Sequence, residues 1–201
     1  LSRDDWQFLT WEHPMVTGAI DLVLSEDRGK ASVALLKNKR IPAGTLLVEA
    51  FYQIHCPAPQ YLQVERFLPS TVLRCLLNAN GQDMSAAVNH EQLSAQCFKA
   101  DRGLARRIVE SQQDVLANVL EKNQAVVLPQ AEALKEKALA AMQAHQQEEI
   151  QRLAALQEIN PAVRPEEVEF LRQQTRALTE HLEKTTCELA AIRVIVATET
   201  N

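Results

Sequence analysis

The chain has 201 residues, of which 46% are hydrophobic and 23% are charged, and its formal net charge is -5. These proportions are ordinary for one globular domain or slightly more, and the negative balance excludes a surface that is basic throughout. The four cysteines have no close pair, which argues against a disulfide framework or zinc knuckle, and no apolar run spans a bilayer. We expect a cytoplasmic protein. Because the chain begins with leucine rather than methionine, we also expect a fragment of a larger one.

The first predicted elements lie near the chain start. Residues 1–13 contain both tryptophans, Trp6 and Trp11, which we interpret as core closure or as a cover for the junction with a preceding domain. Pro14 at a first helical position, followed by apolar residues at helical spacing, predicts an amphipathic helix over 14–24.

A small sheet is predicted next. A first strand covers residues 30–36. In a second, at 45–56, polar and apolar residues alternate, which is typical of a half-buried strand with Glu49, Gln53 and His55 on its polar face. The other predicted elements of this half are strands at 61–67 and 71–78, a turn at 78–81 and a short helix at 90–99.

The second half is helical in character from Leu104 onward. Pro129 predicts a kink or a break in its first long helix. Strong helix formers fill residues 130–159. They include a narrow seam of small or apolar residues at Ala131, Leu134, Ala138 and Ala141.

A heptad pattern runs from residue 165 to residue 196. Steps of three and four residues separate Val168, Leu171, Thr175, Leu178, Leu182, Thr185, Leu189, Ile192 and Val196. Such a stripe requires a helix alongside it, and Pro161 and Pro165 mark a turn before it, so we predict an antiparallel helical hairpin. Helices of this length should project from the body at one end. The β-branched segment 192–196 could instead return to the sheet as a strand.

The predicted fold class is therefore α+β, with a small mixed or antiparallel sheet in the first half and a long antiparallel helical hairpin in the second. We divide the chain into a mixed subdomain, 1–103, and a long-helix subdomain, 104–201, within one compact unit.

The residue pattern predicts no catalytic, cofactor-binding or metal site. The nucleotide-loop pattern is absent around 29–30. His55 and Cys56 are adjacent on a strand and point to opposite faces, so they cannot share a metal. His145 and His181 lie on opposite arms of the hairpin and could face each other, but we assign neither a role.

Two groups of basic residues have alternative interpretations. Both could be solvated charged segments, or they could contact a phosphate backbone or an acidic protein surface, although no aromatic residues are interleaved to stack on bases. The groups are Lys37, Lys39 and Arg40, and Lys99, Arg102, Arg106 and Arg107.

The octet Leu-Thr-Trp-Glu-His-Pro-Met-Val at 9–16 resembles the opening of the carboxy-terminal region of the RapA family, the bacterial Swi/Snf-type ATPases associated with RNA polymerase. Residues 49–59, 66–69, the turn at 160–161 and the ending 189–196 are similar to the same region in order and spacing. Residues 78–131 match it least well.

This resemblance implies a parent that hydrolyses ATP with two lobes, moves on double-stranded DNA and recycles RNA polymerase core. Those lobes, with their ATP and magnesium, are not in this chain, so no catalytic residue carries over. We expect a non-catalytic interaction or regulatory domain whose partners are the polymerase core and the parent's ATPase lobes, with DNA reached through the parent and no membrane. The alternatives are an accessory duplex-DNA-binding domain, a coiled-coil spacer, and self-association through the heptad face.

Overall fold

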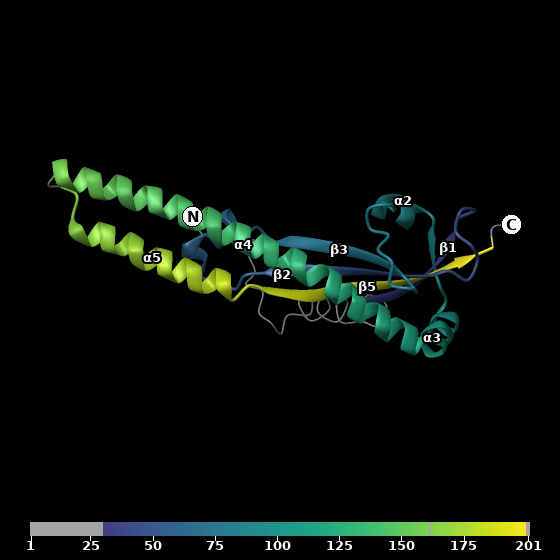
Figure 1. Cartoon of the computed structure of the whole chain (residues 1–201). Coiled ribbons are helices and arrows are strands. Elements are labelled where there is room, and N and C mark those ends of the chain that lie inside the picture. Colours follow the sequence, from purple (N-terminus) through teal and green to yellow (C-terminus); the bar gives the residue numbers. More distant parts are fainter. Residues whose placement is uncertain (1–29, 161, 200–201) are drawn as a thin grey trace, which may run out of the picture.

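The computed structural model describes residues 30–160 and 162–199. In these ranges a five-stranded mixed sheet lies beside two long antiparallel helices, and one end of this hairpin stands clear of the sheet (Figure 1). The predicted α+β class, the mixed sheet and the projecting helical hairpin are confirmed. Trp6, Trp11 and the helix predicted over 14–24 lie outside the described residues.

The sheet draws strands from both halves of the chain. Its strands are β1 (Ala31–Lys37), β2 (Leu46–His55), β3 (Thr71–Asn78), β4 (Cys97–Lys99) and β5 (Thr186–Thr198). In the order β3-β2-β5-β1-β4, the last strand in sequence lies in the middle. β5 pairs antiparallel with all 10 residues of β2 and parallel with all 7 residues of β1. The return of segment 192–196 to the sheet is confirmed, and the strand is longer than predicted.

The helices are α2 (His90–Ala95), α3 (Arg102–Ser111), α4 (Gln113–Ile159) and α5 (Pro165–Glu183), and two short 3-10 helices are η2 (Gln60–Leu62) and η3 (Val64–Arg66). The 47 residues of α4 make it about 70 Å long. α4 runs through Pro129, so of the predicted kink or break, the break is wrong and the kink stays a prediction. The proline is exposed, while Val127 and Ala131 on either side of it are buried, and this packing holds the helix together across the missing hydrogen bond.

Three other predicted elements differ from the structure. The strand predicted at 61–67 is wrong: η2 and η3 occupy it, joined by Gln63 in the left-handed conformation at φ 48°. Leu62 and Val64 are both buried, and this two-residue spacing of buried apolar side chains is the same as in a half-buried strand. The helix predicted at 90–99 ends at Ala95, because residues 97–99 pair with β1. The heptad pattern is helical only as far as Glu183.

The heptad seam itself packs as predicted up to that point. Val168, Leu178 and Leu182 are buried. Thr175 is partly buried in the seam, and its hydroxyl donates to the Leu171 carbonyl at 2.7 Å, which satisfies this polar group within the helix. On α4, Met142 is buried where the sequence suggested Ala141, which is exposed.

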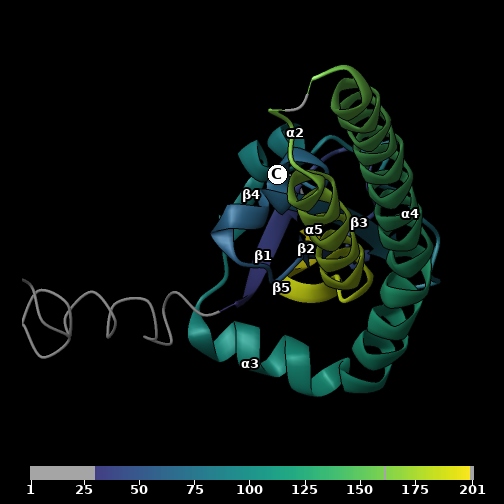
Figure 2. The ribbon, with the colours of Figure 1, turned by 90° about the vertical axis from the view of Figure 1, so that its left-hand side faces the viewer.

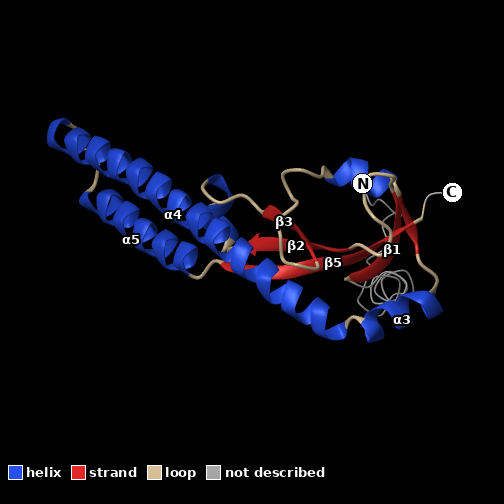
Figure 3. Ribbon diagram, turned by 45° about the vertical axis from the view of Figure 1, so that its right-hand side comes forward, coloured by secondary structure: helices blue, strands red, loops and turns tan. Residues whose placement is uncertain are grey.

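Both faces of the sheet are covered where β2 begins. Viewed from the hairpin end, α4 lies on one side of the strands and α2 on the other (Figure 2), and Figure 3 shows the helices along the sheet. On one face Val48 packs with Val119 of α4, and on the other Leu47 packs with Leu93 of α2. The first five residues of β2 are consequently all buried, and the predicted half-buried alternation holds only for its second half.

Candidate interaction surfaces

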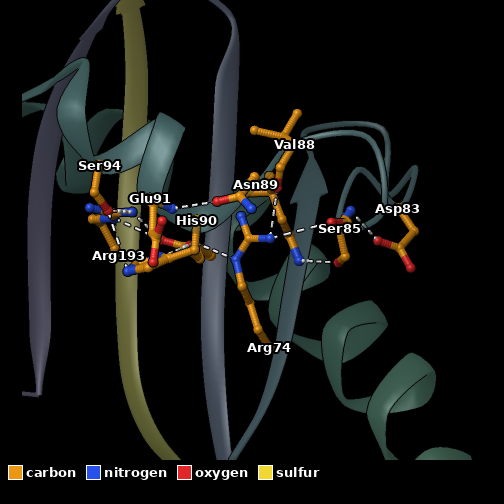
Figure 4. Close-up of polar contacts among 11 residues, drawn as sticks. Arg74, Asp83, Ser85, Val88, Asn89, His90, Glu91, Ser94 and Arg193 are labelled. Carbon is orange, nitrogen blue, oxygen red and sulfur yellow. Dashed lines mark hydrogen bonds and ion pairs between the residues drawn. The ribbon is translucent and has the colours of Figure 1, made fainter.

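Glu49 of β2 is 0% exposed and lies at the centre of a polar cluster. Its carboxylate accepts hydrogen bonds from Arg74 Nε at 2.6 Å and Arg193 Nε at 2.8 Å, and His90 Nδ1 lies 2.9 Å away (Figure 4). Arg193 is directly opposite Glu49 in the β2–β5 ladder. Arg74 lies on β3, Arg193 on β5 and His90 on α2. This one carboxylate therefore links the strands on either side of β2 to α2, which covers this face of the sheet.

The electrostatics of this cluster favour the charged carboxylate. Burial acts to raise the pKa of Glu49, but the hydrogen bonds from His90, Arg74 and Arg193 outweigh it and hold that pKa below its ordinary value. Arg74 also donates from Nη1 to the Val88 carbonyl at 2.8 Å, which fixes the loop before α2. We interpret the cluster as a clamp that holds α2 and the loop before it on the sheet.

This clamp was not predicted from the sequence, because Glu49 fell on the polar face of an alternating strand. A signal was nevertheless present. Glu49, Arg74 and Arg193 each interrupt a strongly apolar stretch, in LLVEAFYQI, TVLRCLL and AAIRVIV. A charged residue isolated in a buried strand needs a partner of opposite charge, and these three form such a set.

The histidines singled out from the sequence have separate contacts. Arg66 Nη2 lies 3.0 Å from His145 Nε2, and His181 Nδ1 lies 2.6 Å from the Pro57 carbonyl, so the suggested pairing of His145 with His181 is not observed. Cys56 donates its thiol to the His181 carbonyl at 3.1 Å and helps to pin the end of α5. In the described part of the chain, no group of three or more His, Cys, Asp or Glu could hold a metal.

The two basic groups lie on adjoining elements. Lys37 ends β1, and its ammonium lies 5.3 Å from the ring centre of Phe98 in β4. β4 is antiparallel to β1, so from Lys99 the chain leads away from Lys37 toward α3. Arg106 on α3 is in an ion pair with Glu110 at 2.8 Å, which compensates part of the positive charge there.

The free end of the hairpin carries exposed apolar side chains. Leu156, Ile159 and Phe170 are 36%, 80% and 62% exposed. A hollow of about 690 Å³ lies between α4 and α5 here, with Leu153 and Phe170 in its lining. A second hollow, of about 440 Å³, shares lining residues with the first and continues toward η3. None of the helices in the described ranges is both long and apolar enough to cross a membrane.

Comparisons with known proteins agree over nearly the whole chain. The family described as "RNA polymerase recycling family C-terminal" matches residues 1–197. The RNA polymerase-associated protein RapA of Stutzerimonas stutzeri (strain A1501) is 45% identical over 197 residues, which are 98% of this chain and 21% of that protein. The protein of the same name from Vibrio atlanticus (strain LGP32) is 39% identical over 196 residues, 98% of this chain and 20% of that protein. The chain thus spans about a fifth of the length of these curated relatives.

Proposed function

Since the chain belongs to the C-terminal family of RNA polymerase recycling proteins, we propose that it is an interaction and regulatory domain without catalytic activity of its own. In this proposal its parent is an ATP-dependent DNA translocase that binds RNA polymerase core and promotes its recycling. The observation that carries the proposal is the family match over residues 1–197, together with relatives that are named as RNA polymerase-associated proteins.

The architecture supports a role in binding. A sheet clamped at Glu49 forms the base, and α4 and α5 project from it with apolar side chains exposed at their far end. A projecting hairpin of this kind can reach a partner surface that the body cannot touch. The partners in this proposal are the polymerase core and the ATPase lobes of the parent, which would carry ATP and magnesium. The location would be the cytoplasm, at the nucleoid through the polymerase.

Binding measurements on the isolated chain test the proposal. We expect it to bind RNA polymerase core at near-physiological salt and not to bind a short DNA duplex under the same conditions. Binding to neither would contradict the polymerase role and would direct attention to the parent chain. ATP hydrolysis by the isolated chain would contradict the non-catalytic assignment. A change in ATP hydrolysis when this region is removed from the parent would support regulation.

The exposed basic residues keep one rival function open, an accessory DNA-binding domain. It predicts duplex affinity that falls steeply with salt. Replacing Arg106 and Arg107 by glutamine should then reduce the salt slope by about one unit for each phosphate that the variant no longer neutralises. In a spacer role, deletion of the hairpin end would leave polymerase binding intact.

A further inference from the structure

The two faces of the sheet are covered unequally where β1 lies beside β5. On the face that α2 covers, Ala34 and Leu36 of β1 are buried, at 7% and 0% exposure. On the opposite face, Val33 and Leu35 are only partly buried. Among the described elements, α4 packs on this opposite face mainly against β2 and β3. The part of the face that belongs to β1 and β5 is therefore less well covered.

The side chains on this part of the sheet are apolar. Val196 lies opposite Leu35 in the ladder and is partly buried, as is Ile192. Leu189 lies opposite Tyr52 and is 41% exposed. We call this surface the β1–β5 face and define it by the residues Val33, Leu35, Leu189, Ile192 and Val196.

Helix α3 borders the β1–β5 face and brings positive charge to it. Ile108 packs against the same apolar cluster, although none of the residues of α3 is buried. With three arginines and one glutamate, α3 has a formal net charge of +2. It begins beside the start of β1, because the Ala100 N–H donates to the Val33 carbonyl at 3.2 Å. A segment that covers this face should therefore be apolar toward the strands and acidic near the start of β1.

Residues 14–27 of the chain itself have this chemistry. They contain three acidic residues, Asp21, Glu26 and Asp27, and no lysine or arginine. The amphipathic helix expected over 14–24 would be about 16 Å long, and the strand from Ile192 to Val196 spans about 13 Å, so the lengths match. The apolar residues at helical spacing are Met15, Val16, Ala19, Ile20 and Val23.

The connection to the sheet is short. Residues 25–29 separate the expected helix from Lys30, whose carbonyl accepts a hydrogen bond from the Ile192 N–H at 2.7 Å. Five residues span at most about 18 Å, so the end of the helix would lie within that distance of the start of β1. On the other face of the sheet, Leu93 of α2 already packs against the residues of β1. The β1–β5 face is the one with room for a helix.

We propose that residues 14–24 pack as a helix on the β1–β5 face, with Ile20 toward the strands. Glu26 and Asp27 then lie near the first arginines of α3. The chain covers this face with its own segment, so a partner of the domain has to bind elsewhere. The inference does not depend on the function proposed above.

Photochemical cross-linking of the full 201-residue chain tests this placement. With photoreactive p-benzoylphenylalanine in place of Ile20, we expect links within one chain to residues 31–37, 186–198 or 102–111. The matched control carries the same group in place of Gly18, which lies on the opposite side of the expected helix and should give at least fivefold fewer links to these residues. Mixing ordinary and nitrogen-15-labelled chains distinguishes links within a chain from links between chains.

Thermal unfolding tests whether the contact is a packed one. Ile20→Ser should lower the melting temperature by about 4 °C, because it removes an apolar side chain from the interface. Thr17→Ser introduces the same residue on the polar side of the expected helix and should lower it by about 1 °C at most.

The charge contribution is measured by the yield of the cross-link from position 20. Glu26→Lys/Asp27→Lys should lower this yield at least twofold at low salt and less at high salt. The control Glu136→Lys/Glu158→Lys makes the same charge change at exposed sites on α4 and should leave the yield unchanged.

The outcomes decide between this placement and others. Links within one chain to the β1–β5 face that depend on the side of the helix, together with the loss of stability in Ile20→Ser, would support it. Equal links from positions 18 and 20, links that map to other surfaces, or links only between chains would overturn it. An unchanged melting temperature for Ile20→Ser would overturn the packed contact.

Discussion

At the scale of single residues, a substitution of Glu49 measures how much its polar cluster contributes to stability. Glu49→Gln keeps the size of the side chain but removes the charge that compensates Arg74 and Arg193, whose side chains are only 18% exposed. Because it leaves two partly buried charges uncompensated, we expect the free energy of unfolding to fall by about 3 kcal/mol, measured by urea denaturation near neutral pH. Glu110→Gln, which breaks the exposed pair with Arg106, is the control and should cost less than about 0.5 kcal/mol.

The same carboxylate makes stability depend on pH. The pKa of Glu49 in the folded chain lies below its ordinary value of 4.5, so near that pH the folded state binds fewer protons than the unfolded state. The stabilisation is therefore complete above the unfolded pKa and is lost as the pH falls through the folded pKa. Denaturation curves collected from neutral to acidic pH should show a steeper loss of stability for the native chain than for Glu49→Gln. Parallel losses would show that Glu49 is not responsible.

At the scale of elements, the seam between α4 and α5 can be tested at Leu182. This side chain is 0% exposed, so Leu182→Ala should lower the free energy of unfolding by roughly 2 to 5 kcal/mol. Leu156→Ala, at a position on α4 that is 36% exposed, should cost far less. Thermal or urea unfolding followed by circular dichroism measures both. A cost near zero for Leu182→Ala would mean that the seam is not a packed interface.

Pro129 offers a second test at this scale. Inside α4 it lacks the N–H that would bond to the carbonyl four residues earlier. Its ring is exposed, so replacing it should remove little packing. Pro129→Ala should therefore raise the free energy of unfolding by about 1 to 3 kcal/mol. Leu128→Ala, at the exposed neighbouring position, controls for helix propensity. Destabilisation by Pro129→Ala would show that a bend at the proline is needed for α4 to follow the sheet.

How well the elements could be predicted depended on whether their pattern was local. The strand at 45–56 was placed within one residue at each end, and the turn before Pro165 was placed correctly, because alternation and proline act locally. The heptad pattern extended too far, because Leu189, Ile192 and Val196 keep helical spacing by coincidence while they lie in β5. The three apolar stretches interrupted by Glu49, Arg74 and Arg193 signalled a charged set. The covering of this set by α2 and the exposure of Phe170 could not be derived from local pattern, because both depend on how distant segments pack.

At the scale of the whole molecule, the central place of β5 links the two halves of the chain. β1 and β2 do not pair with each other, and β5 joins them. Without β5 the sheet would separate into the pairs β3–β2 and β1–β4, and isolated two-stranded sheets are marginally stable at best. β5 of the long-helix part, 104–201, thus lies in the sheet of the mixed part, 1–103, and the division into these two subdomains stays a prediction.

Truncation tests the role of β5. We expect a chain that ends at Lys184, and so lacks β5, to lose its cooperative unfolding transition, because the hydrogen bonds and apolar contacts of β5 with both β2 and β1 disappear together. A chain in which a short glycine linker replaces residues 150–169 removes the free end of the hairpin but keeps the sheet, and it should still unfold cooperatively. Scanning calorimetry of both measures the transition. If the chain ending at Lys184 kept a sharp transition, residues 1–184 would fold cooperatively without β5, and the central strand would not be needed to hold the two parts together.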